Sequence, residues 1–437
     1  MDRIEDNSRH SKKAFIERYP KLSNRLLDKS LKTLLKEENM LIFPNDLEDI
    51  ADLDHKQKII KTLNYQIQIQ NTIGFIGAGD EQLEIFSRFS KDQNHFFLHY
   101  MLQQVLNINI VDLNTKLSME EKLYHFLIYL FPKYLNTAMR KGIFKEYRRV
   151  EYNNTSIKGS IDIARHIKRN TPFTGNIAYS TREFSQDNNL MQLIRHTIEF
   201  IRSSTENGKM ILNSSENTKN NISAVILATP SYHLRDKRKI IIENKTNGIR
   251  HAYYTEYRKL QKLCLMILTY RQHSLGGDRD DIHGLLFDVA WLWEEYIHTL
   301  LNDHFIHACN NKRTHGLSVY ESTFGGYHNR TVFPDFYSKD HQVIADAKYK
   351  RLDSSINRED LYQIITYSYL LKAKSAGIIY PTAALTKHDL IGKVSGYGVN
   401  IFRQSLQIPQ DVSSYKEFAL EIKKAEKVFK KEIDAIL

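Results

Sequence analysis

The stretch at residues 334–350, PDFYSKDHQVIADAKYK, decides how the C-terminal part of this 437-residue chain is expected to fold. One apolar run ends at Asp335 and a second spans residues 342–349, and the short polar segment between them is typical of a β-hairpin. Because side chains alternate along a strand, Asp346 and Lys348 are predicted to share one face. Folding the hairpin would then bring Asp335 beside Asp346, with the lysine next to both.

Two carboxylates beside an ammonium indicate a metal-dependent site. Carboxylate oxygens bind hard divalent cations such as Mg²⁺. A nearby lysine can orient or activate a water and stabilise the charge that develops on a phosphate group. This set of groups is typical of phosphodiester hydrolysis. The alternative is that Asp335, Asp346 and Lys348 form ordinary surface salt bridges, which such residues often do near strand ends.

The segment after the lysine, residues 359–371, has apolar residues at helical spacing. Gln363 and Tyr367 lie four residues apart and are therefore predicted to share one side of that helix. The amide and the phenol could contact a phosphate or a nucleobase beside the metal. A polar flank of an ordinary amphipathic helix would have the same pattern.

A third acidic group is expected upstream, in residues 285–301, which read as one long helix with an apolar stripe. At about 100° per residue, Glu295 falls opposite the stripe and Glu294 falls at its edge, near the buried side. We therefore expect Glu294, rather than Glu295, to join the two aspartates as a metal ligand. An error of one residue in the helix phase would reverse this choice.

The order of expected elements from residue 285 onward is a helix, three strands, a helix and two strands. This order resembles the PD-(D/E)xK nuclease core of the RecB-like kind, with Asp-Ala-Lys at residues 346–348 and the Q-x-x-x-Y element at Gln363 and Tyr367. Further stretches, among them KGSID at residues 158–162 and YSTREFS at 179–185, resemble the McrC family of modification-dependent restriction systems. The similarity covers most of the chain from about residue 65 onward, and the first sixty residues resemble no family.

The resemblance implies a Mg²⁺-dependent endonuclease subunit that cleaves double-stranded DNA containing methylcytosine. It also implies a separate partner, a McrB-like AAA+ GTPase hexamer, which the subunit binds and stimulates. The chain lacks the G-x-x-x-x-G-K-[ST] phosphate loop, which agrees with this division of labour. The acids would bind metal, the lysine would position or help deprotonate water, and the amide and phenol would orient substrate or water. The residues given these roles are Glu294, Asp335, Asp346, Lys348, Gln363 and Tyr367.

The composition indicates a cytoplasmic protein with a polyanionic partner. The formal net charge is +11, and the densest basic region, residues 141–170, reads as a DNA track, as a contact for an acidic partner surface, or as a solvated surface. Two cysteines cannot form a disulfide framework or a zinc cluster. His304 and His307 are expected to pack or face solvent rather than bind metal. No apolar run approaches the ~20 residues that cross a bilayer, so no membrane association is expected.

We expect an α/β (α+β multidomain) fold of three consecutive segments. Residues 1–60 would be a charged helical appendage, residues 61–275 a mixed α/β region for partner and DNA contacts, and residues 276–437 the nuclease domain, with a central mixed sheet flanked by helices. The boundary follows from residues 272–281, which lack apolar periodicity. The competing function is a non-catalytic adaptor that activates an AAA+ motor and binds DNA without cleaving it, and the intact acid–acid–lysine set argues against it.

Overall fold

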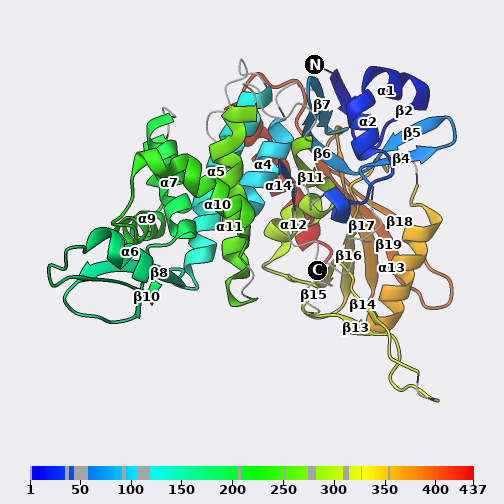
Figure 1. Ribbon diagram of the computed structural model, residues 1–437. Helices are drawn as coiled ribbons and strands as arrows, with labels where there is room; N and C mark the ends of the chain where they lie inside the picture. The colour runs from blue at the N-terminus through cyan, green and yellow to red at the C-terminus, as the bar shows by residue number, and fades with distance from the viewer. Residues whose placement is uncertain are drawn as a thin grey trace. The chain divides into compact units, whose positions relative to one another are not determined.

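The computed structural model describes residues 2–34, 39–43, 58–90, 95–106, 119–204, 208–249, 252–273, 282–308, 314–325, 327–352 and 355–437. The chain divides into two compact units, the first formed by Met1–Met119 with Asp278–Leu437 and the second by Glu120–Gly277 (Figure 1). Among the described residues, no helix has both the length and the apolar character needed to cross a membrane.

The N-terminal part of the first unit is built on a five-stranded sheet and a three-stranded sheet. In spatial order, the five strands are β1 (Asp2–Glu5), β7 (Glu81–Phe86), β6 (Thr72–Ala78), β11 (Ile282–Asp288) and β3 (Asn39–Phe43). The smaller sheet contains β2 (Arg9–Ser11), β5 (Gln66–Ile69) and β4 (Ile60–Leu63). The helices of this part are α1 (Lys12–Arg18), α2 (Pro20–Leu26), α3 (Leu31–Leu34) and α4 (Phe96–Leu106).

Strand β6 is buried along its whole length because it lies between β7 and β11. Gly74 allows this close approach: its φ is +140°, and a Cβ atom there would lie 2.1 Å from the carbonyl oxygen of Leu285. A larger residue would push β6 and β11 apart. The absence of a side chain at Gly74 therefore lets β6 pair closely with β11, although about 200 residues separate them in the sequence.

The C-terminal part of the first unit is a six-stranded mixed sheet flanked by helices, as the sequence predicted. Its strands in spatial order are β12 (Phe305–His307), β15 (Phe336–Ser338), β16 (Val343–Ala347), β17 (Ser375–Thr382), β19 (Asn400–Gln407) and β18 (His388–Lys393). A two-stranded ribbon, β13 (Leu317–Ser318) with β14 (Thr331–Val332), precedes β15. The helices are α12 (Val289–Leu301), α13 (Arg358–Leu371) and α14 (Tyr415–Asp434).

All five residues of β16 are buried because helices cover both faces of this central strand. Helix α13 packs on β16 and β17, α12 also packs on β16, and α14 packs on β19. Figure 1 shows α12 and α13 on either side of the sheet. Ile344 of β16, Ile378 of β17 and Ile364 of α13 belong to one hydrophobic cluster. Strands β16, β17 and β19 run parallel, so their carboxyl ends meet at one edge.

The second unit combines a small antiparallel sheet with a group of helices. Its strands, in spatial order, are β8 (Glu146–Asn154), β10 (Ile177–Ser185) and β9 (Ser160–Ile161). Its helices are α5 (Met119–Met139, which begins at the unit boundary), α6 (Ile163–Arg169), α7 (Asn189–Ser204), α8 (Gly208–Leu212), α9 (Glu216–Ala228), α10 (Lys237–Thr246) and α11 (Thr255–His273), with short 3₁₀ turns at Leu234–Asp236 and Ala252–Tyr254.

Two features differ from the expectations. The single helix expected at residues 285–301 is wrong, because residues 285–288 belong to β11 and α12 begins only at Val289. Asp288 separates the two elements, since its side chain accepts hydrogen bonds from the backbone N–H groups of Ala290 and Trp291. The grouping into two units also differs from three consecutive segments, because the five-stranded sheet joins strands from residues 1–60, 61–275 and 276–437.

Candidate active site

The β15–β16 hairpin brings Asp335 and Asp346 together. Phe336 pairs with Ala345 and Tyr337 with Ile344, so the register continues to Asp335 opposite Asp346. Asp335 stands one residue before β15 rather than at the end of a strand, and Lys348 directly follows β16. The backbone N–H of Ala347 donates to Oδ2 of Asp335 at 2.8 Å, which holds this carboxylate at the end of β16.

Asp346 is a fully buried carboxylate that faces Lys348. Nζ of Lys348 lies 2.6 Å from Oδ2 of Asp346. Oδ2 of Asp346 is thus paired with the ammonium, while Oδ1 accepts no hydrogen bond. Burial, and then the charge of Asp335, raise the pKa of Asp346 to about 7. A buried carboxylate beside a second acid is costly when a single ammonium offsets its charge, so this site is suited to an additional cation.

The other two charged groups respond to the same surroundings. Burial raises the pKa of Asp335, although the charge of Lys348 opposes the shift. Burial alone would lower the pKa of the Lys348 ammonium, but the charges of Asp346 and Asp335 outweigh that effect and raise it. Lys348 is therefore protonated at neutral pH. It is a positive donor held between two acids.

Glu294 projects from α12 toward the same centre. Loss of water around it, and then the charge of Asp335, raise its pKa well above the usual range, and Asp346 adds to the shift. The expected contrast with Glu295 is wrong: the two side chains are 31% and 29% exposed, and their carboxylates lie 3.7 and 3.8 Å from Nε2 of His307. The physical reason is that both glutamates flank the buried stripe of α12. Only the influence of Asp335 and Asp346 on its pKa favours Glu294 as the third acid.

His307 is a site residue that sequence reasoning missed. Its Nδ1–H donates to the backbone oxygen of Asp335 at 2.8 Å, and its ring stacks on Phe336. The side chain is therefore held between the acids of α12 and the start of β15. No local pattern could reveal this role, because it depends on the pairing of β12 with β15. Asp360 was also missed. It binds Nζ of Lys350 at 2.5 Å and contributes to the raised pKa of Asp346.

Gln363 and Tyr367 lie together on α13, as the helical spacing predicted. Nε2 of Gln363 donates to the hydroxyl oxygen of Tyr367 at 2.9 Å. Tyr367 is buried in the cluster between α13 and the sheet. Burial raises its pKa, and the charges of Asp346 and Asp335 also raise it. The phenol therefore lies close enough to the two aspartates to feel their charge.

A divalent ion needs several oxygen ligands. In the part of the chain that the structure describes, no three or more His, Cys, Asp or Glu side chains form a group that could hold a metal ion, so these residues supply no complete protein cage. Mg²⁺ commonly uses only one or two carboxylates, with waters and substrate phosphates as its other ligands. Asp335 and Asp346 fit that demand, since Oδ1 of Asp346 accepts no hydrogen bond.

The fold and the site define an α/β protein whose C-terminal mixed sheet carries a buried aspartate and, opposite it, a second aspartate, both beside a lysine. A family model described as "McrBC 5-methylcytosine restriction system component" matches residues 67–381, which is more than half of the chain. The chain belongs to this family, and the resemblance seen in the sequence is confirmed at that level.

Two solved structures resemble this chain. The first is described as a refined half-complex from a tetradecameric assembly of Thermococcus gammatolerans McrB AAA+ hexamers with bound McrC. It matches with 17% identity and a TM-score of 0.50 over 100% of both chains, so the two share a fold. The second, a cryo-EM structure of the Thermococcus gammatolerans McrBC complex, matches with 17% identity and a TM-score of 0.32 over 69% of this chain and 86% of that chain. No curated protein matches this chain.

Proposed function

We propose that this chain is the Mg²⁺-dependent endonuclease subunit of a McrBC-type restriction system. It would cleave DNA containing methylcytosine together with an AAA+ GTPase partner that it binds and stimulates. The observation that carries the proposal is the fully buried Asp346, which lies opposite Asp335 and pairs with Lys348, while its Oδ1 accepts no hydrogen bond. Family membership and the similar assembly of McrB AAA+ hexamers with bound McrC support the choice of partner.

In this proposal Asp335 and Asp346 hold the ion. Glu294 does not form a three-membered ligand group with them in this structure, and it would approach the ion as a third acid when the ion binds. The fold around them would be a PD-(D/E)xK core. When bound, the divalent ion supplies a Lewis acid that lowers the pKa of a water and offsets negative charge on the phosphate. Lys348 contributes as a protonated donor, because its raised pKa prevents it from acting as a base at neutral pH. It would hold a phosphate oxygen or the attacking water and stabilise the transition-state charge.

Gln363 and Tyr367 orient the reacting groups in the same proposal. Because the Gln363 amide donates to the Tyr367 oxygen, the phenol proton remains to donate to a water or a phosphate oxygen, and the Gln363 carbonyl remains to accept from a water. His307 would hold the backbone at Asp335 through its hydrogen bond to that carbonyl. Each of these residues acts by position and charge, and none exchanges a proton in the step.

The test is DNA cleavage by the chain reconstituted with its AAA+ partner, GTP, Mg²⁺ and methylated duplex. Asp346→Asn should lower the cleavage rate by roughly 100-fold or more, as expected for loss of an electrostatic group at the reaction centre. Partner binding and stimulation of GTP hydrolysis should stay at wild-type levels. Asp411→Asn is the matched control, because Asp411 is exposed and asparagine tolerates its φ of +55°. Normal cutting by Asp346→Asn would refute the nuclease and leave a DNA-binding adaptor.

A further inference from the structure

A cavity of about 640 Å³ opens in the first unit, between the N-terminal strands and the C-terminal sheet. One wall comes from the ends of β1 and β7 and includes Glu5, Phe86 and Phe89. The other wall comes from segments that follow β16, β17 and β19, and includes Arg351, Ala384 and Gln410. This volume lies within the range of about 300–1,000 Å³ that small-ligand sites occupy.

The cavity lies at the same edge of the sheet as the candidate active site. Lys348 directly follows β16. The cavity lining at residues 381–384 begins at Pro381, near the carboxyl end of the parallel strand β17. In open α/β sheets, ligands bind outside the carboxyl ends of the strands. Arg351 comes three residues after Lys348, so their Cα atoms are at most about 11 Å apart. If a phosphodiester is cleaved beside Lys348, the neighbouring nucleotides of that DNA strand must lie along this edge of the sheet.

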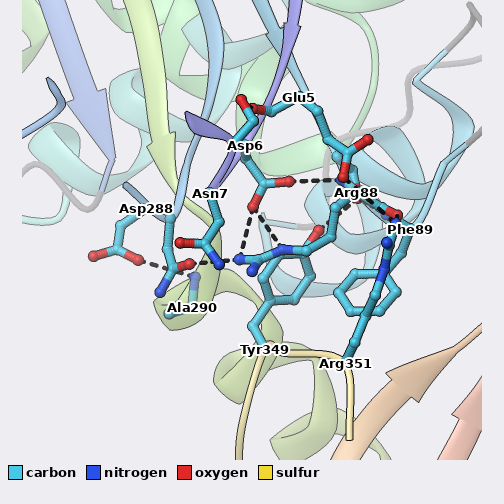
Figure 2. Close-up of polar contacts among 12 residues, drawn as sticks. Glu5, Asp6, Asn7, Arg88, Phe89, Asp288, Ala290, Tyr349 and Arg351 are labelled. Carbon is cyan, nitrogen blue, oxygen red and sulfur yellow. Dashed lines mark hydrogen bonds and ion pairs between the residues drawn. The ribbon is translucent and has the colours of Figure 1, made fainter. Parts of the chain in front are cut away.

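The walls of the cavity are fixed by buried polar contacts (Figure 2). Arg88 forms an ion pair with the buried Asp6 at 2.8 Å, and its guanidinium lies 5.0 Å from the ring centre of Tyr349. The Tyr349 hydroxyl is 2.5 Å from Oγ of Ser87. Nη2 of Arg351 donates to the backbone oxygen of Arg88 at 2.8 Å. The cavity is therefore preformed, and little binding free energy would be spent on ordering its side chains when a ligand binds.

The chemistry of the walls suits one nucleotide. The Arg351 side chain is 57% exposed, and its planar fork keeps donors that match a phosphate. Its contact with Glu5, at 3.4 Å, is a solvent-exposed pair that is weak enough to be exchanged. Phe86 is partly exposed and offers aromatic surface for a sugar or a base, and Gln410 adds an amide. A bound phosphate would replace Glu5 as the partner of Arg351, and the base would lie toward Phe86.

We propose that this cavity is a subsite for one nucleotide that flanks the cleaved phosphodiester, with Arg351 bound to its phosphate. The inference rests on the proposed nuclease function, and it adds a defined DNA contact outside the metal-binding acids. It also gives the N-terminal strands a direct part in holding the substrate.

The experiment measures binding of the full-length chain to a fluorescein-labelled duplex at several salt concentrations, in an Asp346→Asn background that does not cut. Arg351→Ala should weaken binding by roughly tenfold and reduce the slope of log K against log salt by about 0.9, the value for one lost phosphate contact. Ala384→Trp fills the cavity from an exposed position and should weaken binding by a similar factor. Leu385→Trp is the control, because Leu385 is 77% exposed and does not line the cavity.

Cleavage by the reconstituted complex separates this inference from the nuclease assignment. With Asp346 intact, Arg351→Ala should raise KM for DNA more than it lowers kcat. Wild-type affinity and salt slope in both Arg351→Ala and Ala384→Trp would overturn the subsite while leaving the nuclease intact. Loss of partner binding with unchanged DNA binding would also overturn it. If the wild-type chain failed to cut but both variants lost DNA affinity, the nuclease assignment would fall and the DNA subsite would stand.

Discussion

Asp346→Asn is expected to stabilise the chain above pH 7 even though it removes a proposed metal ligand. Burial and the nearby charge of Asp335 raise the pKa of Asp346 from 3.8 to about 7. The folded state therefore holds this proton more tightly than the unfolded state, so stability falls as pH rises from about 4 to about 7 and is flat above. Three units at ~1.4 kcal/mol each give an upper limit of about 4 kcal/mol.

The observable gain is smaller because Lys348 loses its ion-pair partner in the same variant. We expect a net increase in the free energy of unfolding of about 1–3 kcal/mol at pH 8 and almost none near pH 4. Thermal melts in EDTA at both pH values measure the difference, with Asp411→Asn as the control. Adding Mg²⁺ should raise the melting temperature of the wild type and narrow the gap, because only the wild type gains binding energy. A variant less stable than wild type at pH 8 would refute the reasoning that burial of the Asp346 charge costs more than its pairing with Lys348 returns.

Three further outcomes follow from contacts in the first unit. Tyr349→Phe removes the hydroxyl that meets Ser87 and should cost about 1–2 kcal/mol in urea unfolding, with Ser87→Ala adding little more to it. Burial alone would raise the pKa of Glu84, but hydrogen bonds and charges from His95 and Arg3 lower it to about 2. Glu84→Gln should therefore lower the free energy of unfolding by up to about 3 kcal/mol at pH 7, and this loss should shrink as the pH falls below 4.5. Tyr367→Phe should slow cleavage by roughly 100-fold while leaving the melting temperature near wild type, and equal cutting would exclude the phenol from the reaction.

The hairpin and helix of the candidate site could be predicted because their signals are local. Alternation along residues 342–349 was sufficient to place Asp346 in a strand, and the polar residues before it marked the turn. The spacing of Gln363 and Tyr367 fixed their common side of α13, since a helix brings residues four apart together without help from the rest of the fold.

What could not be predicted depends on pairing between distant segments. The apolar run at residues 285–288 suits a helix or a strand equally, and only its pairing with β6 and β3 makes it β11. His307 joins the site because β12 pairs with β15, which no spacing within the sequence encodes. The same is true of the Tyr349–Ser87 contact, whose partners are 262 residues apart.

The joint at Asp288 has a mechanical consequence. Strand β11 belongs to the N-terminal sheet, and the next residue begins α12, which carries Glu294 five residues further on. No loop lies between them to absorb movement. Glu294 is about 8 Å along the helix from this joint, so a tilt of about 10° there would carry its backbone by about 1.4 Å. A shift of that size is enough to separate an acid from a bound ion. A small movement of the N-terminal sheet would therefore change the position of Glu294 in the proposed metal site.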